Sequence, residues 1–167
     1  KKLNINNPFS KNYLNSSLIW IVGSSGCGKS TLFSMIAGIR PIDNGSIKLS
    51  LPISKKESYF SKNIYDLIAY MPQDPIFSST TIREYIQDGD FKIDDQNILK
   101  VINKLQISKS FNINPNQILD LVVGPRGFSP SGGQAKLLSF TRAICKRDVE
   151  IYLLDEPTSE LSKELRQ

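Results

Sequence analysis

The 167-residue sequence contains no histidine, only two cysteines and a single tryptophan. Without histidine, the chain cannot by itself supply a Ser-His-Asp triad, a Cys-His dyad or a histidine-ligated metal site. Cys27 and Cys145 are too few for a disulfide scaffold and lack metal-site spacing, which favours a reducing, cytosolic compartment. Apolar runs such as residues 18–22 are far too short to cross a bilayer. Any chemistry here must therefore use carboxylates, lysines, hydroxyls and backbone groups.

The composition is that of a globular protein with a packed core. Hydrophobic residues make up 40% of the chain and charged residues 22%, and the length fits one domain. The net charge of +5 is spread over short basic pairs such as Lys55 and Lys56, with no aromatic residues between them. Clustered charge, rather than total charge, attracts polyanions. We therefore expect no nucleic-acid partner.

The apolar pattern predicts an α/β fold. Residues 18–22 form a continuous apolar run typical of a strand buried on both faces of a parallel sheet, and a glycine-rich turn and a helix ending near Gly38 follow. Further strands are expected at residues 46–50, 67–71 and 151–154, a polar loop at 51–62, and helices at 81–87, 94–105 and 131–147. In the last helix Leu137, Phe140, Thr141 and Ile144 share one face. Cys145 is expected to be a buried residue of this helix.

The order of these elements predicts an α/β core with a mainly parallel sheet and an inserted helical subdomain. Residues 1–78 and 148–167 would form the α/β core, and residues 79–147 the helical subdomain. We expect the whole chain, residues 1–167, to be one domain.

Residues 23–30 fit the phosphate-loop pattern G-x-x-x-x-G-K-[ST] without a gap, so the predicted α/β core is that of a P-loop NTPase. Glycines let the backbone curl so that successive N–H groups converge on one anion, and the following helix adds its positive end. Lys29 would reach the β- and γ-phosphates, and the Ser30 hydroxyl would ligate Mg²⁺. The predicted nucleotide-binding residues in this loop are Gly23, Ser24, Ser25, Gly26, Cys27, Gly28, Lys29, Ser30 and Thr31.

Two adjacent carboxylates, Asp155 and Glu156, follow the apolar strand at residues 151–154. The carboxyl edge of an open α/β sheet is where ligands bind. We expect Asp155 to hold a hydrated Mg²⁺ and Glu156 to act as the general base on the attacking water.

With these motifs in order, the sequence resembles the ATP-binding cassette (ABC) ATPases. Ser131, Gly132, Gly133 and Gln134 resemble the family's signature motif, residues 70–75 its Q-loop, and residues 156–161 the start of its D-loop. Ser131 is also a typical helix N-cap, so its helix would present N–H groups and a dipole to an anion. The resemblance implies that these four signature residues face the ATP of a second cassette. It also implies that Gln73 contacts Mg²⁺ and the attacking water.

The resemblance further implies a function. It predicts an ATP- and Mg²⁺-dependent ATPase that powers transport, lies at the cytoplasmic face of a membrane, and pairs with transmembrane domains and with a second ABC ATPase domain, identical or not. Residues 77–84 resemble the F-S-x-T-I-R-E segment of exporters. Residues 123–127 resemble their V-G-E-R-G element, with Pro125 in place of the acid. Export is therefore expected.

Several positions depart from the family pattern. Pro130 replaces the signature's leading leucine, Ala135 and Lys136 replace its usual continuation, and Ser162 replaces the D-loop aspartate. The switch histidine is absent, and Tyr13 is too close to Gly23 to be the adenine-stacking aromatic. We therefore expect a fragment of a longer polypeptide that by itself binds nucleotide weakly and hydrolyses it slowly.

Two alternatives stay open at this point. One is a soluble ABC ATPase that does not act in transport, although only 102 positions separate Lys29 from Ser131 and leave no room for a long coiled-coil insert. The other is a degenerate regulatory half of a heterodimeric transporter. Pro130 and Ser162 favour this second alternative slightly, and Glu156 argues against it.

Overall fold

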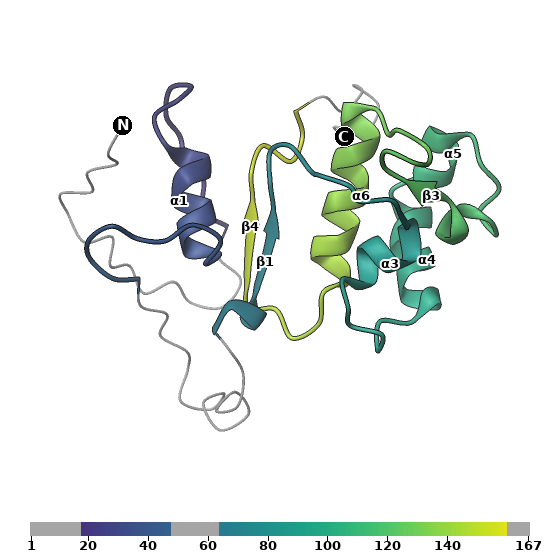
Figure 1. Ribbon diagram of the computed structural model, residues 1–167, viewed down its shortest axis with the longest axis horizontal. Helices are drawn as coiled ribbons and strands as arrows, with labels where there is room; N and C mark the ends of the chain where they lie inside the picture. Colours follow the sequence, from purple (N-terminus) through teal and green to yellow (C-terminus); the bar gives the residue numbers. More distant parts are fainter. Residues whose placement is uncertain (1–17, 48–63, 160–167) are drawn as a thin grey trace.

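The computed structural model describes residues 18–47 and 64–159 (Figure 1). Its helices and strands include a run of consecutive helices between β2 and β3, and the last described element is a strand. They are α1 (Lys29–Ile36), the 3-10 helix η1 (Ile64–Leu67), β1 (Ile68–Met71), β2 (Thr80–Thr81), α3 (Ile82–Gln87), α4 (Asp95–Lys104), α5 (Ile107–Phe111), the 3-10 helix η2 (Ile118–Asp120), β3 (Val122–Val123), α6 (Gly132–Cys145) and β4 (Ile151–Leu154).

Strands β1 and β4 pair in parallel, although about eighty residues of sequence separate them. The register pairs Ile68 with Ile151, Ala69 with Tyr152, Tyr70 with Leu153 and Met71 with Leu154. One step beyond the strands, the Asp155 N–H donates to the Met71 carbonyl at 3.0 Å. This pairing confirms the strands expected at residues 67–71 and 151–154, and it places their carboxyl ends together.

A second small sheet lies among the helices. Strands β2 and β3 pair antiparallel, with Thr80 opposite Val123 and Thr81 opposite Val122. Val123 also makes an isolated parallel bridge with Phe128, but among the strands of the described residues β1 and β4 are the parallel pair. The expectation of a mainly parallel sheet is met only by that pair.

Two faces of helix α6 are covered, one by the helical part and the other by β1. Leu137 and Leu138 join the apolar cluster of the helical part, whereas Phe140 and Ala143 pack with Ala69 and Met71 of β1. Because two faces are covered, the single apolar face expected from the sequence is wrong in part: Ile144 is exposed. The helices expected at residues 81–87, 94–105 and 131–147 are confirmed as α3, α4 and α6.

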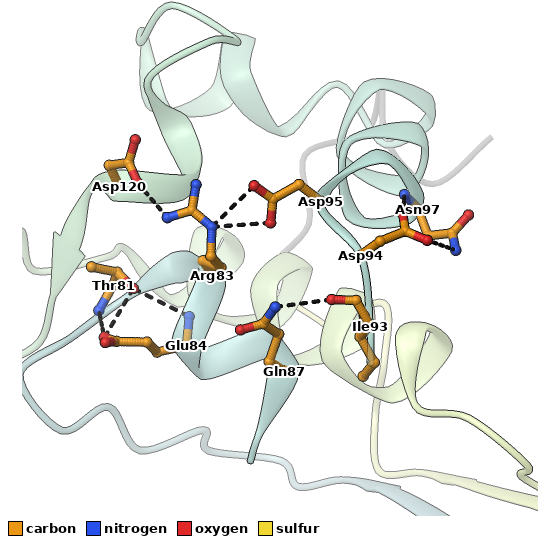
Figure 2. A network of polar contacts seen from close by, with 9 residues as sticks. All are labelled: Thr81, Arg83, Glu84, Gln87, Ile93, Asp94, Asp95, Asn97 and Asp120. Atoms are coloured by element: carbon orange, nitrogen blue, oxygen red, sulfur yellow. Dashed lines mark hydrogen bonds and ion pairs between the residues drawn. The ribbon is translucent and has the colours of Figure 1, made fainter. Parts of the chain in front are cut away.

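Polar contacts tie the helical part together around Arg83 of α3 (Figure 2). Its guanidinium donates to Asp95 at the start of α4, at 3.0 Å, and also to Asp120 of η2. These hydrogen bonds, the one to Asp95 first, raise the pKa of Arg83. Thr81 and Glu84 form a capping box that starts α3, and Asp94 caps α4 through the Asn97 N–H at 2.7 Å. The strong local start signals explain why these helices are predictable.

The strand expected at residues 18–22 is wrong in this structure. These residues have no strand pairing, and their side chains are exposed, Leu18 by 79% and Trp20 by 77%. A strand needs a neighbouring backbone as well as an apolar sequence, and no described strand lies beside this segment. Helix α1 follows as expected, ends before the left-handed Gly38, and has no buried residue.

Other expectations fall partly or wholly outside the described residues. Ser46 and Ile47 are described and form no strand, while the rest of the strand expected at residues 46–50 lies outside. The loop at residues 51–62, Tyr13 and Ser162 also lie outside. Over the two described stretches, none of the helices combines the length and the apolar character that crossing a membrane requires.

The Arg83 network should contribute to stability. Replacing Arg83 with Met removes the ion pairs to Asp95 and Asp120, which are partly solvent-exposed, so the free energy of unfolding should fall by about 1 kcal/mol. Urea unfolding followed by circular dichroism measures this as a lower midpoint at an unchanged slope. The exposed Arg147, replaced with Met in the same way, is the control. Equal midpoints for both variants would contradict the role of the network.

Candidate functional site

Three structural features lie at one end of the molecule. The loop before α1, the carboxyl ends of β1 and β4, and the start of α6 all lie at the upper end of Figure 1. Helix α6 runs antiparallel to β4 because the short connection at residues 146–150 joins their lower ends. The glycine-rich loop, the Q-loop after β1, the two carboxylates after β4 and the signature residues therefore lie toward the same end of the fold.

The glycine-rich loop has the backbone conformation that its sequence requires. Gly26 and Gly28 adopt φ angles of 73° and 108°, a left-handed region in which side chains other than glycine are strained. Gly28 is the N-cap of α1 and offers no side-chain cap, so the first-turn N–H groups of α1 have no side-chain acceptor. Such a helix start suits an anion.

Lys29 is folded back over its own loop. Its ammonium donates to the Gly23 carbonyl at 2.9 Å and to the Ser24 carbonyl at 3.1 Å. A Cβ at Gly23 would lie 2.7 Å from the Cys27 sulfur, so any other residue there would make the Cys27 side chain move. The Lys29 ammonium is therefore held against the loop backbone beside the start of α1. Phosphate binding needs a cation at such a position.

Asp155 is buried, with 3% of its surface exposed, and its Oδ2 atom has no hydrogen-bond partner. Buried polar atoms are normally paired, because an unpaired one loses its contacts with water. Together with burial of Tyr70 itself, the Asp155 charge raises the pKa of the neighbouring Tyr70 phenol. The orphaned oxygen is what a carboxylate would show where a cation binds.

Glu156 meets Gln73 across the edge of the sheet. The Gln73 Nε2 donates to the Glu156 Oε2 at 3.3 Å, although 83 positions separate them. Each residue follows the carboxyl end of one strand of the β1–β4 pair, so the strand pairing is what brings them together. Glu156 is exposed and has a left-handed φ of 50°.

The signature residues form a capped helix start, as expected. Ser131 accepts from the Gln134 N–H, and the Gln134 Oε1 accepts from the Ser131 N–H at 2.9 Å. Gln134 also donates to the Ser110 carbonyl at 2.7 Å, which fixes the helix start to α5. Gly132 is exposed and Gly133 half-buried. Pro130 precedes the cap without disturbing it.

The two segments that resemble exporter elements lie against each other. The Arg126 N–H donates to the Ser79 hydroxyl at 3.1 Å. Gly124 has a φ of 108°, and a Cβ there would lie 2.8 Å from the Ser78 carbonyl. The antiparallel pairing of β2 with β3 therefore makes one surface from residues 77–84 and 123–127, on which Pro125 is exposed.

Sequence reasoning missed the role of one residue, Lys136. It was noted only as a departure from the signature, yet it is 3% exposed and donates to the Glu156 carbonyl at 3.3 Å and to the Ser159 hydroxyl. Its position in the sequence could have indicated burial, because Lys136 stands between Ala135 and Leu137, which are both buried in the structure.

Comparison with known proteins gives the family. The family profile described as ABC transporter matches residues 8–159. The chain belongs to the ABC transporter family. Among similar curated proteins are the mitochondrial iron-sulfur clusters transporter ATM1 of Debaryomyces hansenii, 34% identical over 89% of this chain, and ABC transporter B family member 21 of Arabidopsis thaliana, 35% identical over 93%. A candidate export ATP-binding/permease protein of Rickettsia prowazekii is 32% identical over 95%.

These ABC relatives are much longer than the present chain. The matched region spans 21%, 12% and 27% of the three proteins, respectively. The chain therefore corresponds to one part of each relative, the part matched by the ABC transporter profile.

The two thiols of this ABC domain should differ in reactivity and in response to nucleotide. Iodoacetamide should modify Cys27 first, because Cys27 is exposed whereas burial raises the pKa of the half-buried Cys145 thiol to about 11. MgATP should slow the modification of Cys27 alone. Mass spectrometry of peptides sampled over time measures both rates, and Cys27→Ala should leave only the slow reaction. A Cys27 rate that is indifferent to MgATP would contradict a phosphate site in the glycine-rich loop.

Proposed function

We propose that this chain is the ATP-binding and ATP-hydrolysing domain of a membrane transporter, and that the transporter is an exporter. The observation that carries the proposal is the pairing of Gln73 with Glu156 beside the buried, unpaired Asp155, at the carboxyl edge of the β1–β4 pair. A water-positioning amide, a base and a cation ligand at one edge are the parts that nucleotide hydrolysis needs.

The described residues fit ATP with Mg²⁺. Asp155 offers a buried carboxylate oxygen without a protein partner, and the Ser30 hydroxyl and the Gln73 side-chain carbonyl would add oxygen donors of the kind that Mg²⁺ prefers. The glycine-rich loop offers uncapped N–H groups at the start of α1, beside the Lys29 ammonium. Held by these oxygens, Mg²⁺ would supply positive charge to offset the negative charge of the phosphates.

In this proposal, each side chain has a distinct task. Lys29 and the N–H groups of residues 23–31 hold the phosphates. Gln73 donates a hydrogen bond to Glu156 and so orients the carboxylate, and Glu156 accepts a proton from the attacking water at its carboxylate.

The same proposal includes two kinds of partner. The exposed start of α6, with Ser131, Gly132, Gly133 and Gln134, would face the nucleotide of a second ABC domain. Transmembrane domains would hold the assembly at the cytoplasmic face. The helical part at residues 79–147 has its own apolar cluster, separate from the cluster beside β1 and β4, which supports its assignment as a subdomain on a core of residues 1–78 and 148–167.

Export is favoured by the surface made of residues 77–84 and 123–127. Its two segments resemble exporter elements and lie together in the structure. A relative from Rickettsia prowazekii carries export in its name, and others belong to the ABC B family.

A degenerate regulatory half of a heterodimeric transporter is the second candidate. The Pro130 and Ser162 substitutions favour it. Glu156 favours the hydrolytic function instead, because its carboxylate is present and accepts a hydrogen bond from Gln73.

Glu156→Gln in the complete protein should separate these two functions. The amide keeps the shape of the carboxylate but cannot accept a proton, so ATP hydrolysis should fall by ~10²–10⁴-fold with nucleotide affinity unchanged. Single-turnover hydrolysis and calorimetric titration with ATP measure the two quantities. Asp66→Asn, at an exposed carboxylate of η1, is the control. Hydrolysis by the Glu156 variant at the wild-type rate would reject the general-base assignment, and absence of hydrolysis in the unaltered protein would favour the regulatory half.

A further inference from the structure

Lys136 lies in an environment that lysine seldom occupies. It is the fifth residue of α6 and is 3% exposed, among side chains of the helix that are themselves buried. A buried ammonium is costly unless hydrogen bonds replace its water. Its ammonium donates to the Glu156 carbonyl and to the Ser159 hydroxyl, both in the turn that follows β4.

That turn needs support because of the conformation of Glu156. A φ of 50° is unfavourable for a residue with a Cβ and persists where the surroundings hold it. The Glu156 carbonyl accepts from the Ser159 N–H at 3.2 Å, from the Ser159 hydroxyl at 2.9 Å and from Lys136 at 3.3 Å. Of these donors, Lys136 alone comes from outside the turn.

The two ends of Glu156 are thus held by different elements. Its backbone carbonyl is held from α6 by Lys136, and its carboxylate is held from the loop after β1 by Gln73. Lys136 lies five positions after Ser131, within the rigid first turns of the signature helix. A displacement of that helix start would therefore move the Glu156 backbone through the Lys136 side chain.

We infer that Lys136 is a positioning residue for Glu156, which connects the start of the signature helix to the base. The inference rests on the proposed function, because it requires Glu156 to act on water. Lys136 touches neither nucleotide nor water in this account; it fixes the turn from which the carboxylate extends. Misplacing a reacting group by about 1 Å can cost about 10²-fold in rate.

The test compares Lys136→Met with Lys136→Arg in the complete protein. Methionine matches the length and volume of the buried side chain without its donors, and arginine restores donors. We expect Lys136→Met to lower kcat for ATP by at least about tenfold at unchanged KM and unchanged ATP affinity, and Lys136→Arg to recover part of the loss. Lys100→Met, at an exposed position of α4, is the matched control and should behave as wild type.

A double-mutant cycle separates positioning from a general structural role. If Lys136 acts through Glu156, adding Lys136→Met to Glu156→Gln should change the residual single-turnover rate less than twofold. An equal fall in both backgrounds, or a kcat of Lys136→Met within twofold of Lys100→Met, would overturn the inference. If Lys136→Met does not fold, Lys136→Gln decides in its place: its shorter side chain draws back from the Glu156 carbonyl, and an unchanged kcat would reject the inference.

The outcomes also distinguish the inference from the proposed function. Wild-type hydrolysis by Glu156→Gln alone would reject the base assignment and the inference together. An inactive Glu156→Gln with a fully active Lys136→Met would leave the proposed function intact and reject only the role of Lys136.

Discussion

The parallel pairing of β1 with β4 is the interaction on which the candidate site depends. It joins segments about eighty residues apart, and its register carries on through the Asp155 N–H to the Met71 carbonyl. Because both strands end at the same level, Gln73 and Glu156 meet just beyond them. A slip of one residue would turn Asp155 away from its buried position and separate the amide from the carboxylate.

Helix α6 transmits this arrangement to the rest of the chain. One face packs on β1 through Phe140 and Ala143, and the other joins the helical cluster that Arg83 holds together at its polar edge. Its first turn carries the signature residues, and its fifth residue, Lys136, holds the Glu156 backbone. One helix therefore links the signature residues, the Glu156 turn and the helical part, so a displacement of any one of them reaches the others by direct contact.

Local patterns were sufficient to predict most of the described elements. The strands at residues 67–71 and 151–154 and the three main helices are confirmed, because strong caps or short apolar runs specify them. The strand expected at residues 18–22 is wrong, since apolar character gives no information about which backbone lies beside it. The motifs predict Asp155, Glu156 and Gln73 as site residues. They do not predict the contact between Gln73 and Glu156, because that contact depends on the register of β1 and β4. The position of Lys136 between two apolar residues of a helix could have indicated burial, but its partners in the turn after β4 depend on tertiary packing.

The central claim is that the buried, unpaired oxygen of Asp155 holds the cation of a hydrolytic site. Asp155→Asn in the complete protein tests it most directly, because the change keeps the shape of the side chain and removes its charge. The Mg²⁺ concentration for half-maximal ATP hydrolysis should rise by at least about tenfold, since even second-shell partners of metal ligands contribute about 10–100-fold to affinity. ATP binding measured in EDTA should stay unchanged. An unaltered Mg²⁺ dependence would contradict the account.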